Sequence, residues 1–123
     1  MSYKEDTSWF WEEVFNKGNL VPIDKLIGDN YTFNGQPQTR DQLKQWVNSL
    51  RNTLQGLHFT LDDLLQDENK VAVRWTLIGT DSTSHQRMTN TGTNILTFYD
   101  GKALSNWQNG GTPQDLHPIP PGE

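Results

Sequence analysis

The most regular stretch of the sequence is VAVRWTLIGT, at residues 71–80. Alternate side chains of a β-strand point to opposite faces, so this stretch divides into two rows. One row holds Val71, Val73, Trp75 and Leu77, and the other holds Ala72, Arg74, Thr76 and Ile78. The alternation predicts a strand. One row must face the core, and an apolar row on the other side would need a partner to cover it.

More strands are predicted around this one. Residues 57–65 alternate in the same way, and the stretches 93–99 and 103–109 follow a polar loop at 81–90. Asp100-Gly101, between the last two stretches, is typical of the tight turn that joins two antiparallel strands. The sequence from residue 57 onward therefore predicts a run of antiparallel strands.

The first half of the chain favours helices. They are predicted over residues 8–17, 22–27 and 39–54, and the third opens with the capping-box pattern Thr39-x-x-Gln42. Helices followed by antiparallel strands form an α+β fold. We expect a curved antiparallel sheet of about four main strands wrapped around the three N-terminal helices, with a cavity inside if the sheet curls strongly.

Composition narrows the class of protein. The chain has 123 residues, enough for one domain, and it contains five Trp, three Tyr and five Phe, so large rings must build the core or line a cavity. A net charge of −5 argues against nucleic-acid binding. Because there is no cysteine, disulfides and Cys-based zinc sites are excluded.

The sequence also allows predictions about location, domain bounds and metal binding. No stretch approaches the roughly 18 apolar residues of a membrane span, so we expect a cytoplasmic protein that does not enter membranes. Residues 1–111 are predicted to form the single domain, and residues 112–123, with four prolines, an irregular tail. The three histidines lack metal-ligand spacing, so neither a metal nor a cofactor is expected.

Several short phrases, in this order and spacing, carry a resemblance to a known family. The chain resembles the SnoaL-like polyketide cyclase and ester cyclase family of the nuclear transport factor 2-like (NTF2-like, cystatin-like cone) superfamily. The resemblance implies a cone with a ligand-sized cavity, a small hydrophobic or polyketide-like ligand, and a homodimer formed through the sheet face. The phrases are EVFNKGN at 13–19, TRDQL at 39–43, LHFTLDDL at 57–64, VAVRWTLIGT at 71–80, DGK at 100–102, and Trp107.

The sequence departs from the family at three polar pocket positions. In the cyclases, an Asp four residues after the Trp of the last strand is the expected acid/base, and Gly111 stands there in this chain. The family's Asp-His pair after an early Tyr becomes Phe33-Asn34, and the His after Gly-Thr becomes Asp81. The resemblance therefore does not carry over the cyclase activity.

Three residues are candidates for catalysis. Asn109 shares a face of the last strand with Trp107 and Gly111, which the resemblance turns toward the cavity, and its amide could polarise a ligand carbonyl. Arg74 could bind a carboxylate or an enolate oxygen. It could instead pair with Asp62 or Asp63, or be exposed to solvent beside a dimer partner. His58 could exchange protons near neutral pH, or could be an exposed residue at a sheet edge.

Aromatic residues are the candidates for ligand binding, because small-molecule pockets are usually lined by rings with few polar groups. Plain core packing is the alternative for each. Two functions stay open: a ligand-binding protein with cyclase- or isomerase-type acid–base chemistry, or a non-catalytic module that binds a ligand or another protein. The predicted ligand-binding residues are Trp107, Tyr31, Phe33, Trp46, Phe59, Trp75 and Trp11.

Overall fold

The helices begin where the sequence supplies caps. The computed structural model of the protein describes residues 2–120. Helix α1 (Tyr3–Phe10) starts from a capping box between Ser2 and Glu5, and α3 (Arg40–Thr53) starts from the predicted one between Thr39 and Gln42. The chain continues from α1 into the π-helical segment η1 (Trp11–Asn16), and α2 is the short helix Val21–Leu26. No helix within residues 2–120 is long and apolar enough to cross a membrane.

The strands form one curved sheet in the order β2-β1-β6-β5-β4-β3. Neighbours from β3 to β6 are antiparallel, as predicted, whereas β1 pairs with β6 in parallel, so the sheet is mixed. The α+β class is confirmed. The strands are β1 (Ile27–Phe33), β2 (Gln36–Pro37), β3 (Leu54–Asp67), β4 (Lys70–Asp81), β5 (Arg87–Tyr99) and β6 (Lys102–Gly110).

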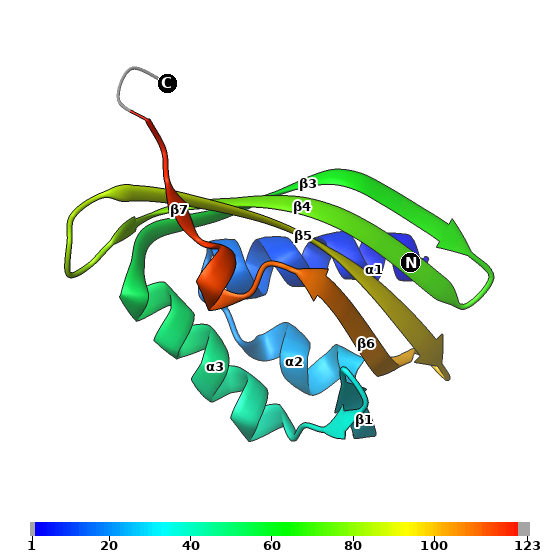
Figure 1. Cartoon of the computed structure of the whole chain (residues 1–123). Coiled ribbons are helices and arrows are strands. Elements are labelled where there is room, and N and C mark those ends of the chain that lie inside the picture. Colours follow the sequence, from blue (N-terminus) through cyan, green and yellow to red (C-terminus); the bar gives the residue numbers. More distant parts are fainter. Residues whose placement is uncertain (1, 121–123) are drawn as a thin grey trace.

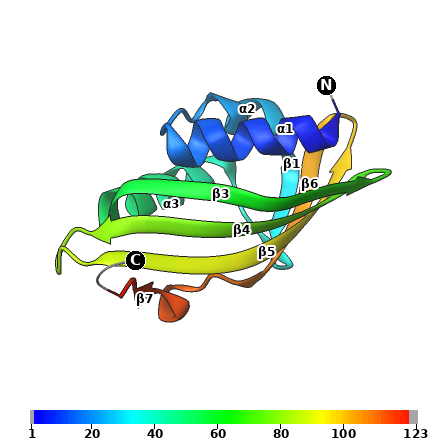
Figure 2. The same ribbon diagram turned by 90° about the horizontal axis from the view of Figure 1, so that it is seen from above.

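The sheet bends around the helices. Strands β3, β4 and β5 are long and run side by side, and α1, α2 and α3 lie on the concave side (Figures 1 and 2). The row Val71, Val73, Trp75 and Leu77 is buried against the helices, which places Arg74 and its row on the convex side. The core therefore lies between the concave face and the helices.

The C-terminal segment is more ordered than the sequence predicted. A single turn, η2 (Pro113–Asp115), leads to β7 (His117–Pro118), which pairs with Met88 and Thr89 of β5. Strand β5 begins at Arg87 and not at residue 93, because the polar residues before 93 alternate and pair with β4. Within the described part of the tail, residues 112–120, the prediction of irregular structure is wrong at Pro113–Asp115 and His117–Pro118, because the earlier start of β5 supplies an edge on which the chain pairs. The rest of the predicted tail, residues 121–123, lies outside the described residues.

One asparagine joins the helical layer to the sheet. The Asn16 side chain accepts from the Phe59 backbone N–H at 2.7 Å and donates to the Phe59 carbonyl at 3.0 Å. Arg51 of α3 donates to the carbonyls of Phe15 and Asn16, the last of η1. These contacts hold the end of η1 against both β3 and α3.

Replacing Asn16 with alanine is expected to destabilise the protein by about 1–3 kcal/mol, because two backbone groups of Phe59 would lose their partners. Urea unfolding monitored by circular dichroism measures the loss. The matched control is Asn48→Ala, on the exposed side of α3, which is expected to leave the unfolding free energy nearly unchanged. Equal effects of the two substitutions would contradict the role of Asn16.

Candidate functional site

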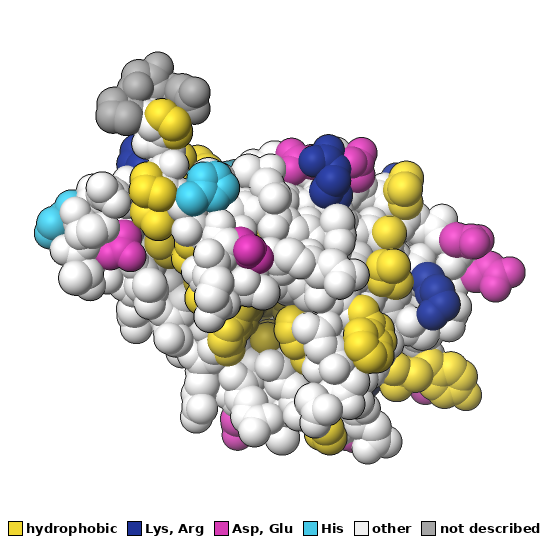
Figure 3. Space-filling model, viewed as in Figure 1, with side chains coloured by type: hydrophobic (Ala, Val, Ile, Leu, Met, Phe, Trp, Pro, Cys, Tyr) yellow, Lys and Arg dark blue, Asp and Glu magenta, His cyan; other side chains and the backbone are white. Residues whose placement is uncertain are grey.

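A cavity of about 320 Å³ lies between the concave face of the sheet and the helices. Hydrophobic side chains gather where the surface is hollowed near the middle of the view in Figure 3. Residues from α1, η1, α3 and strands β1 and β3 to β6 line it, and Pro113 and Leu116 of the C-terminal segment complete the wall. The cavity is thus built from both ends of the chain.

Aromatic rings in mutual contact form much of the wall. The Phe59 ring lies 4.9 Å from the rings of Trp75 and Phe15, measured between centroids, and Phe15 also contacts Trp46 and Trp11. Trp46 is 45% exposed, so its ring lies at the opening. The predicted ligand-binding residues that line the cavity are Trp11, Tyr31, Phe33, Trp46, Phe59 and Trp75.

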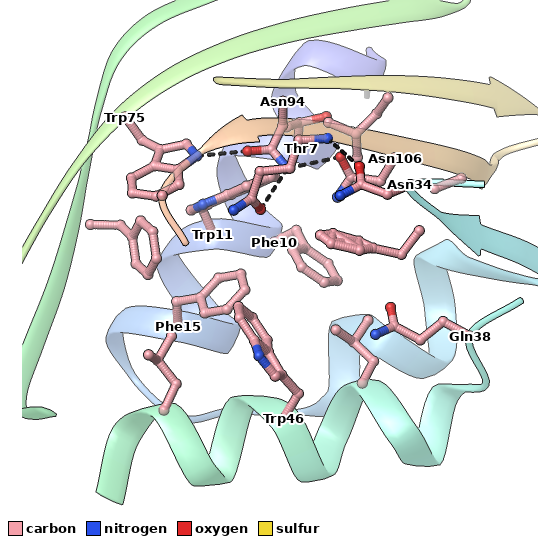
Figure 4. Close-up of a pocket in the computed structure, with 18 of the residues that line it drawn as sticks. Thr7, Phe10, Trp11, Phe15, Asn34, Gln38, Trp46, Trp75, Asn94 and Asn106 are labelled. Carbon is pink, nitrogen blue, oxygen red and sulfur yellow. Dashed lines mark hydrogen bonds between the residues drawn. The ribbon is translucent and has the colours of Figure 1, made fainter. Parts of the chain in front are cut away.

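Side-chain amides form a connected polar group in the cavity wall (Figure 4). The Trp75 indole N–H donates to the Asn94 carbonyl at 2.6 Å. The Asn94 amide donates to Asn106 at 2.9 Å and to Gln108 at 3.3 Å. Asn34 accepts from the Gln108 backbone N–H at 2.7 Å. These groups can orient a ligand by hydrogen bonding, but amides do not exchange protons at neutral pH.

Ionisable groups are nearly absent from this wall. Among residues 2–120, no Asp, Glu, His, Lys or Arg lines the cavity, and Tyr31 is the one lining residue that titrates. Burial raises the pKa of Tyr31 to about 12, although its hydrogen bond with Asn106 acts in the opposite direction. Tyr31 is therefore a protonated phenol at physiological pH, which can donate a hydrogen bond and cannot act as a base.

The predicted catalytic residues do not meet in the cavity. Arg74 is exposed on the convex face, where its Nε lies 2.6 Å from Asp63 and its Nη1 3.7 Å from Asp62, the ion pair that the sequence left open. His58 is exposed on β3. Asn109 lies in a shallow depression of the convex face. The structure thus gives none of the three a position from which to touch a ligand in the cavity.

The prediction that Trp107 and Asn109 face the cavity was wrong. Trp107 is 54% exposed on the convex face, while Asn106 and Gln108 line the cavity. The alternation of β6 ends at Gly110, and both Gly110 and Gly111 adopt positive φ values of 72° and 69°. In a regular strand Gly111, four residues after Trp107, would lie on the same face as Trp107. Because the strand is broken here, Gly111 lies in the cavity wall instead, and the assumed period of two does not hold.

Gly111 also lies where no larger residue fits. A Cβ atom at Gly111 would overlap the Trp75 ring, and so would one at Gly92, the partner of Trp75 on β5. The positive φ of Gly111 disfavours any L side chain as well. Space that an Asp side chain would need at this position is filled by the Trp75 indole.

Sequence reasoning missed the amide group. Asn90 and Asn94 lie in the same inward row of β5 as Leu96 and Phe98, and both are buried. A polar residue in an otherwise buried row is a signal for an internal hydrogen-bonding site, because burial without a partner is costly. The predicted strand 93–99 already places Asn94 in one row with Leu96 and Phe98, and the start of β5 at Arg87 adds Asn90 to that row.

The raised pKa of Tyr31 predicts how the stability of the protein depends on pH. Tyrosine in the unfolded chain ionises near its ordinary pKa of about 10. Because the folded value is about 12, the stability that this difference contributes is intact below pH 10 and is lost as pH rises from about 10 through 12. Urea unfolding across this range is expected to show the loss in the unaltered protein and in Tyr99→Phe, an exposed matched control. Tyr31→Phe is expected to lack it, and an unchanged loss in Tyr31→Phe would contradict the assignment.

Comparison with known proteins assigns the fold to a family. None of the curated proteins searched matches the chain. Solved structures do: a SnoaL-like polyketide cyclase from Agrobacterium tumefaciens has a TM-score of 0.79 and 16% identity, over 94% of this chain and 95% of that one. TsrD from Streptomyces laurentii has a TM-score of 0.79 and 19% identity, over 88% and 87%.

A third structure, IdmH from Streptomyces antibioticus, has a TM-score of 0.77 and 20% identity, over 89% of this chain and 93% of that one. At these identities the similarity establishes the fold. The family model for the SnoaL-like domain matches residues 9–106, most of the chain. The chain therefore belongs to the SnoaL-like family.

Proposed function

We propose that this protein binds a small, uncharged, hydrophobic ligand in its cavity and does not perform the acid–base chemistry of a cyclase. The observation that carries the proposal is the composition of the wall. Within residues 2–120 it consists of rings, aliphatic groups, glycines, amides and the hydroxyls of Thr7 and Thr112, with Tyr31 as its one titrating side chain. Apolar walls with a few placed polar groups are typical of small-molecule sites.

Cyclase-type ring closure needs a base that removes a proton beside a carbonyl, with a pKa near the working pH. Carboxylates and histidines supply such bases, and none lines this cavity among the residues that the structure describes. Asn94, Asn106 and Gln108 could polarise a carbonyl but could not take its proton. The Trp75 ring, packed against Gly111, leaves no room for the acid/base Asp that the family pattern places there.

The family supports the class of ligand. A. tumefaciens has a SnoaL-like polyketide cyclase of the same fold, so a polyketide-like ring system is the first class of compound to test. The competing function, a cyclase- or isomerase-type enzyme, would need a base outside the described wall. Turnover of a bound compound separates the two functions.

The test is tryptophan fluorescence against small aromatic, polyketide-like and terpenoid compounds, with mass spectrometry of the same samples. Trp11, Trp46 and Trp75 line the cavity, so an occupied cavity is expected to change the emission in a saturable way. No new product is expected, and because ring closure or isomerisation can leave the mass unchanged, the compounds are separated by chromatography before the mass is recorded. Ala103→Leu, which adds side-chain volume inside the cavity, is expected to weaken binding several-fold.

The matched control is Ala72→Leu, the same change on the convex face, which is expected to leave binding unaltered. Thermal unfolding of both variants distinguishes lost binding from lost folding. A compound converted by the unaltered protein would overturn the non-catalytic proposal. Saturable binding that survives Ala103→Leu unchanged would place the site elsewhere.

We also propose that the protein forms a homodimer through the convex face of the sheet. Leu65, Ile95 and Trp107 are exposed there and lie around one shallow depression, with the Arg74–Asp63 ion pair beside them. Apolar side chains grouped in this way favour burial against a partner, and the family resemblance indicates a second copy of the chain.

Trp107→Glu is expected to shift the protein from dimer to monomer in sedimentation equilibrium, because the new carboxylate would be buried without a partner. Val21→Glu places the same charge on an exposed apolar residue of α2 and serves as the matched control, which is expected to remain dimeric. A monomeric unaltered protein at micromolar concentration would refute the dimer.

A further inference from the structure

Two polar atoms of the cavity wall have no protein hydrogen-bond partner among the described residues. They are the indole nitrogen Nε1 of Trp11 and the side-chain oxygen Oε1 of Gln38, both fully buried atoms. Trp11 is only 4% exposed as a residue. Buried donors and acceptors are nearly always paired in folded proteins, so two exceptions in one cavity call for a partner that is not the protein.

The indole N–H groups of Trp11 and Trp75 differ in their hydrogen bonding. Both indoles line the same cavity, yet the Trp75 N–H donates to Asn94 at 2.6 Å whereas the Trp11 N–H has no acceptor. Trp11 is held in place, because its ring contacts Phe10 at 5.9 Å and Phe15 at 5.8 Å between centroids. The unpartnered N–H is thus a fixed feature of the wall.

Gln38 is fixed at its backbone as well. It lies between β2 and the capping residue Thr39 of α3, and its backbone N–H donates to the Tyr31 carbonyl at 3.1 Å. Trp11 and Gln38 are well separated across the pocket in Figure 4. The unpartnered donor and the unpartnered acceptor therefore belong to residues in different parts of the cavity wall.

We propose that Trp11 and Gln38 determine ligand specificity: the ligand is uncharged, presents an acceptor such as a carbonyl to the Trp11 N–H, and presents a hydroxyl donor to the Gln38 oxygen. This inference rests on the proposed ligand-binding function. The absence of charged side chains from the described wall disfavours an ionised ligand, because it would be desolvated without a counter-charge.

The test uses three uncharged two-ring probes that differ in their polar groups. 4-(Hydroxymethyl)benzophenone has the carbonyl and the hydroxyl, 4-methylbenzophenone has the carbonyl alone, and 4-benzylbenzyl alcohol has the hydroxyl alone. Calorimetric titration of the unaltered protein is expected to give the tightest binding for the first probe. Each missing group is expected to cost about threefold to tenfold in Kd, the value of one net hydrogen bond.

Variants then assign each group to its residue. Trp11→Phe is expected to weaken the two ketones by about threefold to tenfold and to leave 4-benzylbenzyl alcohol unchanged. Gln38→Leu is expected to weaken the two alcohols and to leave 4-methylbenzophenone unchanged. Trp46→Phe, a change at the opening of the cavity, is the matched control that affects all three probes alike.

The outcomes separate this inference from the proposed function. Equal binding of all three probes, or equal losses in both variants, would overturn the roles of Trp11 and Gln38 while leaving a ligand-binding cavity. Failure of every probe to bind the unaltered protein would overturn both. Tighter binding of the 4-benzoylbenzoate anion than of 4-(hydroxymethyl)benzophenone would refute an uncharged ligand, and conversion of a bound probe would refute only the non-catalytic function.

Discussion

The hydrogen bond from the Trp75 indole to the Asn94 side chain, 2.6 Å long and buried, is the contact on which the rest of the cavity depends. An indole of this size fits under β5 only because its strand partner is Gly92, and it fits beside the end of β6 only because residue 111 is glycine. The ring in turn contacts Phe59, which contacts Phe15 of η1. Helix, sheet and C-terminal segment are thus positioned around one side chain.

This hydrogen bond also determines the chemistry of the wall. A buried indole N–H needs an acceptor, and Asn94 supplies one without introducing a charge. The amide of Asn94 then needs acceptors of its own, which Asn106 and Gln108 provide from β6. A carboxylate at residue 94 would meet the same indole but would be buried without a cation, at a large desolvation cost. Neutral amides follow from a buried indole in an apolar wall.

The sequence predicted those features that depend on local pattern. Alternation at residues 71–80 predicted β4, and Thr39 with Gln42 predicted the start of α3, because each signal lies within one element. The prediction that Trp107 and Asn109 face the cavity together with Gly111 was wrong. The positive φ values at Gly110 and Gly111 change the direction of the chain after β6, so Gly111 does not share their face. Strand periodicity cannot anticipate such a break.

The site itself was predicted unevenly, for a related reason. Rings such as Phe59 and Trp75 were expected to line a cavity, since aromatic residues bury wherever they lie on an inner face. The amides were missed because Asn94, Asn106 and Gln108 come from different strands and acquire their role only through pairing. Arg74 and His58 were chosen as catalytic candidates because of the chemistry of their side chains. Both belong to the outward-facing row of their strands, so neither reaches the cavity.

An open cavity inside a small domain needs support, because protein interiors normally close up to the density of organic crystals. Here separate contacts hold separate parts of the rim. Asn16 fixes η1 to β3, Arg51 fixes the end of η1 to α3, and the pairing of β7 with Met88 and Thr89 holds the segment that carries Leu116 against the opening. None of these contacts fills the space that it borders. Because the walls are held from outside, rings such as Trp11 keep their positions without meeting in the centre, and the space between them stays available to a ligand.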